Sequence, residues 1–410
     1  MKEVKTPIIK SNLWQIFHII NICNTNTCMK KNLFLLTLLL CSCSSELMVN
    51  RNPKTNVAQD STMITMDDYI TKEINVGDII TNRPVCSQMA EIEGKEKYML
   101  LDMNKMYVFD WQTGMLEDSV DFHNCGKITN LSGFAYRNKD SIMVYNYSTK
   151  RMYCVNHDGR IIGEWKFPKS DESSSEYVSA EAINGSNIIC INGASVASGP
   201  IFGNLQDSPD NKERASLLFS VNEKDKKEWL RFPDIYYQAN WGGVYMNSVY
   251  QCKVDSVSWA YSFPIEHYIR RYSSSFSNGD SIYMGSRYID EIVETDINFV
   301  EMILDKKLRD KYYVSQHSYG PIIYDNYHEL FIRVAEHPIK QWNGDVPFFK
   351  PFSLIIMSKD GKMLSETSIR ENSDKLCFGD MYGCKEGLAI RKMTENENVI
   401  SFNIYKIKGQ

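Results

Sequence analysis

The chain has 410 residues, of which 43% are hydrophobic and 12% aromatic, and its formal net charge at pH 7 is −5. This length is enough for one large hydrophobic core or for two domains. Because an acidic chain lacks the basic surface that neutralises phosphates, the composition excludes nucleic acid as an expected partner.

Residues 29–45 have the pattern of an export signal. A basic start at 29–32 is followed by a short apolar run over 33–40 and then by small residues. The run of 8 residues is far shorter than the roughly 20 that a transmembrane helix needs. The segment therefore predicts a signal peptide that is removed from the mature protein, and a buried strand or helix that holds two thiols is the alternative.

A cysteine directly after a small residue marks a bacterial lipoprotein signal, which this segment resembles. Cys43 follows Ser42 and has Leu40 three residues before it, whereas cleavage before Cys41 would place the bulky Leu40 at the cleavage point. We therefore predict a signal peptide over 29–42 and lipidation of Cys43, whose acyl chains would hold the protein on a membrane. The expected location is the cell envelope, as an outer-membrane lipoprotein that is either periplasmic or surface-exposed.

Residues 1–28 precede this signal, although such a signal normally begins at the start codon. Their apolar part, 13–22, is interrupted by Gln15, His18 and Asn21. We expect translation to begin at Met29, which makes 1–28 a wrongly assigned upstream extension. Loss of residues 1–42 removes five Lys and one Glu, so the formal charge of the mature chain becomes about −9.

Residues 43–65 are polar and lack an apolar period, which predicts a flexible tether ahead of a folded domain over 66–410. That domain has seven cysteines without a C-x-x-C pair, so neither a disulfide framework nor a zinc site is predicted: Cys86, Cys125, Cys154, Cys190, Cys252, Cys377 and Cys384. Most should be buried apolar residues. Cys377 and Cys384, expected on neighbouring segments, are the candidate disulfide.

Short apolar runs separated by turn residues fill most of the domain. Clear examples are 98–101, 141–145, 187–191 and 353–357, each bounded by Asn, Asp, Gly or Lys. Tyr, Phe, Trp, Val, Ile and Thr are frequent, and these types favour strands. Helical spacing of apolar residues is clear only over 296–309. The pattern predicts an all-β chain.

Two kinds of turn recur along the chain. Asn138-Lys139-Asp140 is echoed at 278–280, and Asp-Gly pairs at 158–159 and 360–361 supply the positive φ that a two-residue hairpin needs. Over 133–167, strands and turns alternate as a four-stranded antiparallel meander, the unit of a β-propeller blade. We predict a β-propeller of six or seven such blades. A β-sandwich pair, which also uses short strands and tight turns, is the alternative.

Five segments together resemble a family of lipoproteins from anaerobic Gram-negative gut bacteria: 97–101, 107–114, 132–134, 139–142 and 147–149. Residues 319–327 look like a second signature of that family, and 401–407 look like its last strand. The resemblance implies a six-bladed, TolB-like propeller. It implies no activity, because the family is a domain of unknown function.

The usual catalytic motifs are missing from the sequence. It has no G-x-S-x-G elbow, H-E-x-x-H pair, phosphate loop or dinucleotide fingerprint. Residues 193–199 are rich in Gly and Ser but lack the elbow spacing, so we expect a mobile loop there. The histidines after the signal form no close ligand pair, although a propeller could draw one metal ligand from each blade. No catalytic residue, metal site or cofactor is predicted.

One stretch concentrates groups suited to ligand binding: Tyr319, Tyr324, Asp325, Tyr327 and Arg333. An Arg flanked by Tyr residues could grip an anionic or sugar-like ligand through its forked donors and the ring faces. The structural alternative is that Asp325 caps a turn and Arg333 pairs with a carboxylate between blades. The aromatic and Gly-rich segment 241–245 is a candidate rim loop that contacts a partner.

We expect a lipid-anchored β-propeller that binds a protein, peptide or glycan on one face of its ring. The alternative is a propeller hydrolase or lyase that acts on glycans or lactones at the central channel. Converging His, Asp and Glu side chains at the channel mouth would favour the enzyme. An apolar, plugged funnel would favour the binding protein.

Overall fold

The computed structural model describes residues 47–408, apart from 59–61, 78–79, 81–83, 126–130, 147–148, 150, 167–187, 192–193, 199–213, 221–226, 244, 274–278, 345–349 and 370–374. All of the described strands and helices belong to the unit Met48–Gln410. The expected upstream extension, the signal peptide and Cys43 lie outside the described residues. Within the described part, no helix combines the length and the apolar character needed to cross a membrane.

The described residues form six four-stranded sheets in which neighbouring strands are antiparallel. The first three sheets consist of β3 (Cys86–Ile92), β4 (Lys95–Asp102), β5 (Lys105–Asp110) and β6 (Leu116–Asp121); β7 (Leu131–Asn138), β8 (Ser141–Asn146), β9 (Arg151–Val155) and β10 (Ile161–Lys166); and β11 (Ile188–Ile191), β12 (Ala194–Ser198), β13 (Arg214–Ser220) and β14 (Lys227–Arg231). Each of these three sheets is a meander of consecutive strands.

The remaining three sheets follow in chain order, with one exception in the last of them. They consist of β15 (Tyr250–Lys253), β16 (Ser258–Ser262), β17 (Tyr268–Ser273) and β18 (Asp280–Tyr283); β20 (Ser318–Asp325), β21 (Leu330–Glu336), β22 (Phe352–Ser358) and β23 (Met363–Ile369); and β24 (Leu376–Cys384), β25 (Gly387–Lys392), β26 (Val399–Ile407) and the N-terminal β2 (Ile64–Asn75). The last sheet therefore joins strands from both ends of the domain.

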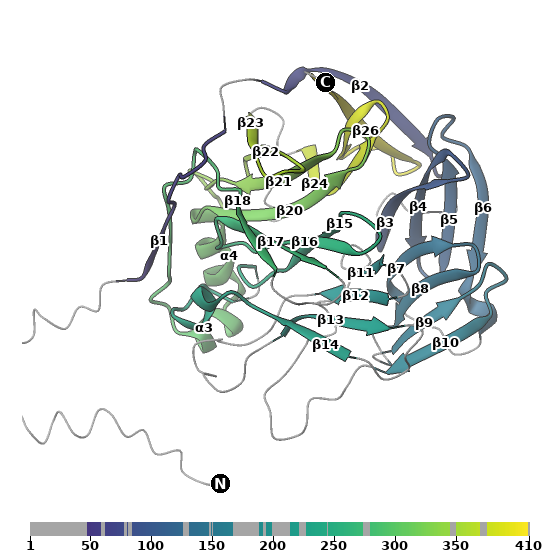
Figure 1. Ribbon diagram of the computed structural model, residues 1–410, viewed down its shortest axis with the longest axis horizontal. Coiled ribbons are helices and arrows are strands. Elements are labelled where there is room, and N and C mark those ends of the chain that lie inside the picture. The colour runs from purple at the N-terminus through teal and green to yellow at the C-terminus, as the bar shows by residue number, and fades with distance from the viewer. Residues whose placement is uncertain are drawn as a thin grey trace, which may run out of the picture. The chain divides into compact units, whose positions relative to one another are not determined.

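The sheets follow one another about a common centre (Figure 1). The first strand of each sheet contacts the first strand of the next, in the order β3, β7, β11, β15, β20 and β24, and β24 contacts β3. This is a propeller arrangement, with at least five blades established. It confirms the all-β prediction and excludes the β-sandwich pair, while the exact count of six or seven blades stays a prediction.

The ring is closed by the pairing of β2 with β26. Ile70 lies opposite Ile404, and Glu73 lies opposite Ser401. After β2 the chain enters β3 of the first sheet, so the outer strand of the last sheet comes from the start of the domain. The two ends of the domain are thus hydrogen-bonded to each other in one sheet.

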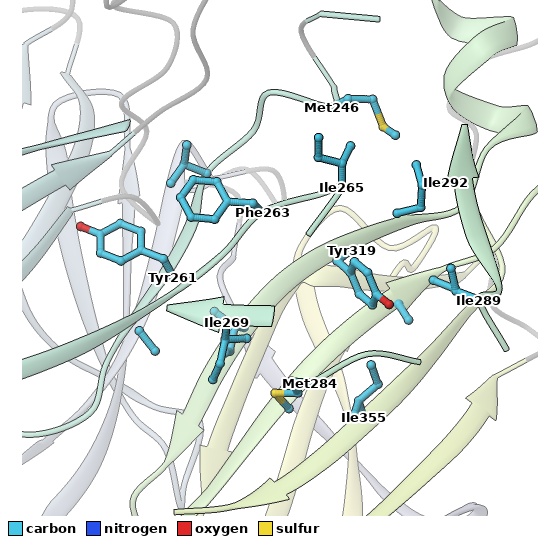
Figure 2. Packing of buried hydrophobic residues seen from close by; sticks show 14 of the residues in the cluster. Met246, Tyr261, Phe263, Ile265, Ile269, Met284, Ile289, Ile292, Tyr319 and Ile355 are labelled. Atoms are coloured by element: carbon cyan, nitrogen blue, oxygen red, sulfur yellow. The ribbon is translucent and has the colours of Figure 1, made fainter. Parts of the chain in front are cut away.

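The hydrophobic core lies between successive sheets. One cluster joins the first and second sheets, another joins the fifth and sixth, and a third joins the sixth and first. Between the fourth and fifth sheets, Figure 2 shows Tyr261, Phe263 and Ile269 in the same cluster as Tyr319 and Ile355. A single meander has two apolar faces, and stacking the meanders buries both.

The predicted strands and turns agree closely with the structure. The described residues of the four example runs lie in β4, β8, β11 and β22, and the predicted meander corresponds to β7–β10. In its first turn the Asp140 N–H donates to Asn138 Oδ1 at 2.9 Å, and Gly159 and Gly361 have φ values of +77° and +90°. The loop expected over 193–199 is wrong, because 194–198 form β12, which pairs on both sides.

The helix expected over 296–309 is two helices, α3 (Phe299–Leu304) and α4 (Lys306–Ser315). Asp305 separates them. Its carboxylate accepts hydrogen bonds from the Lys307 and Leu308 N–H groups at 2.9 and 3.0 Å, which caps the start of α4. Both helices belong to the connection between the fourth and fifth sheets (Figure 1).

Part of the segment predicted as a tether belongs to the folded unit. β1 (Val49–Arg51) pairs with β19 (Glu291–Val293) in a two-stranded antiparallel sheet. The Asn52 amide then donates to the carbonyls of Ser286 and Ile289, each at 2.8 Å. The polar composition that suggested a tether instead provides these hydrogen bonds.

Cys377 and Cys384 form no disulfide, because both are free thiols, as are Cys86, Cys154 and Cys252. The two residues lie at opposite ends of the nine-residue strand β24 rather than on neighbouring segments. A strand rises about 3.3 Å per residue, whereas a disulfide needs Cα atoms within about 7 Å of each other. The hypothesis of a bridge is therefore wrong.

Candidate functional site

The hairpin of β20 and β21 carries all the residues that the sequence singled out for ligand binding, but it separates them into two groups. Tyr319, near the open end of the hairpin, and Arg333, in the middle of β21, are fully buried. Asp325, half-buried Tyr324 and Tyr327, which is 37% exposed, lie at the other end. The five side chains therefore do not form one site.

Arg333 joins the fourth and fifth sheets. Its Nε donates to Ser262 Oγ at 2.8 Å, and its two terminal nitrogens donate at 3.0, 3.1 and 2.7 Å to the carbonyls of Met284, Phe263 and Glu266. The ring centre of Tyr319 lies 3.9 Å from the guanidinium carbon. The side chain is completely buried, which matches the structural alternative, although the acceptors are carbonyls and not the expected carboxylate.

Tyr319 continues this cluster as part of a hydrogen-bond chain. Its hydroxyl accepts from the Ser286 N–H at 3.1 Å and lies 2.8 Å from His267 Nδ1, while His267 Nε2 is 3.2 Å from the Asn50 carbonyl. Since a carbonyl only accepts, Nε2 carries the ring proton and Nδ1 accepts from the tyrosine. Burial, helped by the charge of Arg333, lowers the pKa of His267 to about 4, so the ring is neutral at pH 7.

The other end of the hairpin is a capped turn. Asp325 accepts a hydrogen bond from the Tyr327 N–H at 2.9 Å, and its second oxygen lies 2.7 Å from His328 Nδ1. Asp325 thus has the capping role of the structural alternative. The Tyr327 hydroxyl donates to Glu91 of the first sheet at 3.0 Å, so this turn links sheets that are not neighbours.

A polar cavity of about 540 Å³ lies next to the Arg333 cluster and is lined by parts of 50–53, 232–235 and 266–272. We call it the β1 cavity, because β1 forms one wall. The 3₁₀ helix η5 (Asp234–Tyr237) and the start of β17 form the others. The volume falls within the range of small-molecule sites, which makes this the candidate functional site.

The lining of the β1 cavity combines both signs of charge with aromatic rings. The Arg270 Nε donates to the Glu266 carboxylate at 3.1 Å. Burial raises the pKa of Glu266, and the hydrogen bond and charge of Arg270 oppose that rise. Arg51 and Asp234 are exposed, and Tyr268 and Tyr272 are half-buried. Such a lining can both donate and accept hydrogen bonds and can pack against an apolar ligand face.

Two groups in the cavity that could move a proton, Glu266 and His267, are already engaged. Glu266 is held by Arg270, and both ring nitrogens of His267 have partners. A general base needs a free lone pair within reach of the substrate, and in the observed arrangement neither Glu266 nor His267 offers one. Among the described residues, no group of three or more His, Cys, Asp or Glu side chains could hold a metal ion.

A second buried carboxylate, Glu366, is also fully engaged. It accepts hydrogen bonds from the hydroxyls of Ser286 and Ser353 at 2.5 and 2.6 Å and from the Arg287 N–H at 2.6 Å. Burial raises its pKa, and these hydrogen bonds oppose the rise. Glu366 thus fixes the connection after β18 onto the fifth sheet.

The segment 241–245, expected as a rim loop, packs against the helical connection. Trp241 is 3% exposed and its indole N–H donates to the Ile235 carbonyl at 3.0 Å. The Tyr245 hydroxyl donates to Asp310 at 2.8 Å, and its ring stacks on Tyr313 with centroids 4.6 Å apart. Val244 lies outside the described residues. The aromatic side chains of this segment help to hold α4 in place.

Comparison with known proteins identifies the family. The sequence matches DUF4221, described as a domain of unknown function, over residues 63–368. The chain belongs to the DUF4221 family. A crystal structure of a DUF4221 member from Bacteroides vulgatus ATCC 8482 is similar, with a TM-score of 0.68 at 16% identity over 84% of this chain and 98% of that chain. At this identity the similarity shows the fold alone.

Two other solved structures are more distant. A "Putative exported protein" from Bacteroides fragilis NCTC 9343 has a TM-score of 0.47 at 10% identity, over 86% of this chain and 99% of that chain. The WD40 repeats of RRP9 have a TM-score of 0.43 at 8% identity, over 84% and 99%. No curated protein matches the chain. The DUF4221 match confirms the expected family of unknown function, and it assigns no activity.

The residues of the β1 cavity were not predicted from the sequence of this DUF4221 protein. They come from three segments that are distant in the chain, and none of the segments contains a recognised motif. The nearest signal is the run Glu266-His267-Tyr268-Ile269-Arg270, where ionisable and aromatic residues crowd into one strand start. This run forms part of a cavity only because β1 and η5 pack beside it in the folded protein. The sequence does not show that these segments are neighbours.

We expect Arg333→Lys to lower the free energy of unfolding by about 3–5 kcal/mol, because a single ammonium group cannot replace the fork that satisfies three carbonyls next to strands of the fourth sheet. Urea unfolding measures this loss. Arg51→Lys, at an exposed position, is the control and should change stability by less than about 0.5 kcal/mol. An Arg333→Lys variant as stable as the wild type would contradict the structural role.

We also expect a pH effect from His267. In the folded protein its pKa is about 4, whereas in the unfolded chain it is about 6.5, so between these values only the unfolded chain takes up the proton. The contribution of His267 to stability is therefore complete above pH 6.5 and falls, by up to about 3 kcal/mol, as the pH decreases to 4.

Unfolding free energies at several pH values, compared between the wild type and His267→Gln, measure this contribution. The wild type should lose more stability than the variant over the interval from pH 6.5 to 4. The buried carboxylates Glu266 and Glu366, whose pKa values are raised by burial, act in the opposite direction in both proteins and cancel in the comparison. Parallel pH curves would show that His267 is not held neutral.

Proposed function

We propose that this DUF4221 protein is a lipid-anchored binding protein of the cell envelope that takes a glycan into the β1 cavity. The observation that carries the proposal is the lining of that cavity, in which the ion pair of Glu266 and Arg270 lies with the half-buried rings of Tyr268 and Tyr272. Sugar hydroxyls both donate and accept hydrogen bonds, and the C–H face of a sugar ring packs on aromatic rings.

The charge balance of the cavity favours an uncharged polar ligand. Arg51 and Asp234 stand exposed, and Glu266 and Arg270 neutralise each other inside. An anion would meet Asp234 and Glu266, and a cation would meet Arg51 and Arg270. A neutral glycan can form hydrogen bonds with all four groups, and it carries no charge that any of them would repel.

The proposal includes a propeller of six blades and a lipid on Cys43. Six four-stranded sheets and the contact of β24 with β3 support the blade count. The basic start, the short apolar run and Ser42 before Cys43 support the lipid and, with it, the outer-membrane location. Binding of a protein or peptide in place of a glycan is the alternative outcome of the binding experiments.

Glycan-array screening of the purified protein, followed by calorimetry with the best hit, tests the binding. We expect Arg51→Ala and Asp234→Ala each to weaken binding by about three- to tenfold, since each removes hydrogen bonds worth about 1 kcal/mol. Both residues are exposed, so the fold should persist. Lys54→Ala, on the same segment but outside the cavity, should bind like the wild type. Affinity unchanged by both cavity substitutions would refute the site, and release of shorter sugars would favour the hydrolase.

Mass spectrometry of the mature N-terminus tests the lipid. We expect a diacylated or triacylated Cys43 and recovery of the protein in the membrane fraction. Cys43→Ser should move the protein out of that fraction, because the acyl chains supply the membrane affinity. Cys41→Ser is the matched control and should leave the protein on the membrane. An unmodified thiol at Cys43 would refute the anchor without affecting the glycan site.

A further inference from the structure

We infer that the protein has a second binding site, for a small free carboxylate that carries an apolar tail, between α4 and the loop at 339–344. A cavity of about 550 Å³ lies there, and it shares no lining residue with the β1 cavity. The proposed glycan site makes no use of it. The argument rests on its apolar floor and on the two lysines at its edge.

The floor of this cavity is apolar and its walls are fixed. Leu308 and Val314 of α4 face Ile339 and Trp342 of the loop. Val314 is 2% exposed, whereas Leu308, Ile339 and Trp342 remain partly exposed. The Ile339 N–H donates to the Val314 carbonyl at 2.8 Å, which holds the loop against the helix. A cavity of this size and character suits the hydrocarbon part of a small molecule.

The edge of the cavity carries two lysines that are available to an anion. Lys307 and Lys311 are exposed and lie one turn apart on the same face of α4. In the part of the chain that the structure describes, neither ammonium group pairs with a carboxylate. By contrast, Lys306, which does not line the cavity, pairs with Asp310 at 2.6 Å. The ammonium groups of Lys307 and Lys311 are therefore available to bind an anionic ligand in the cavity.

Among the residues of this lining that the structure describes, Asp305 is the one acidic residue, and its carboxylate is occupied. It accepts the N–H groups of Lys307 and Leu308 as the cap of α4. The two positive charges of Lys307 and Lys311 therefore exceed the single negative charge of Asp305. The cavity thus favours a ligand whose negative charge lies at the edge, above the apolar floor. A purely apolar ligand would leave the lysines unused, and a small inorganic anion would leave the floor unused. A carboxylate with an aliphatic tail uses both.

Isothermal titration calorimetry of the full-length mature protein with octanoate, 1-octanol and acetate tests the inference. Comparison of octanoate with 1-octanol measures the contribution of the charge, and comparison of octanoate with acetate measures the contribution of the apolar tail. We expect octanoate to bind at millimolar concentration or below and at least about tenfold more tightly than 1-octanol, and acetate to give no measurable heat. Added salt should weaken octanoate, because exposed lysines are screened. Equal affinity for octanoate and 1-octanol, or no octanoate binding, would overturn the inference.

The double variant Lys307→Gln/Lys311→Gln should bind octanoate at least about tenfold more weakly and no better than 1-octanol. Lys340→Gln is the matched control, because Lys340 is exposed on the same loop but does not line the cavity. It should bind octanoate like the wild type. An unchanged double variant, or an equal loss in Lys340→Gln, would overturn the site. Glycan binding is measured on separate variants, so the two sites can fail independently.

Discussion

The pairing of β2 with β26 is the constraint on which the whole propeller depends. Each meander has two apolar faces, and a row of meanders would leave one bare face at each end unless the row closed on itself. β2 makes the last sheet out of both ends of the domain. At the same seam, the rings of Tyr98 and Trp111 meet Phe402 edge-on, each with centroids 5.3 Å apart. Opening the ring would break main-chain hydrogen bonds and a hydrophobic core together.

The boundary between the fourth and fifth sheets is built differently. Here the guanidinium of Arg333 satisfies carbonyls of the neighbouring sheet, and the connection carries β19, α3 and α4 in place of a short turn. β1 pairs with this same connection. Of these additions, β1 is one wall of the β1 cavity and α4 is one wall of the second cavity. Each of the two proposed sites therefore includes an element that the repeated meander lacks, although the β1 cavity is also lined by residues of the blade strand β17.

Features that depend on local sequence were predictable, and features that depend on distant segments were not. The Asp-Gly hairpins at Gly159 and Gly361 have the positive φ that the turns require, because turn geometry is set by a few adjacent residues. The sequence also indicated Arg333 as a residue of interest. Its partners, however, include main-chain carbonyls that are distant along the chain. Because every residue has a carbonyl, the sequence could not identify these partners. The Cys377–Cys384 hypothesis failed for the same reason: closeness along the chain said nothing about whether the strand turned between them.

The pairing of β1 with β19 has a consequence for the shape of the β1 cavity. β1 is one wall of that cavity but belongs to none of the six four-stranded sheets. The shape of the cavity therefore depends on three residue pairs with β19 and on the hydrogen bonds of the Asn52 amide. A change that released β1 would remove this wall and leave every blade intact.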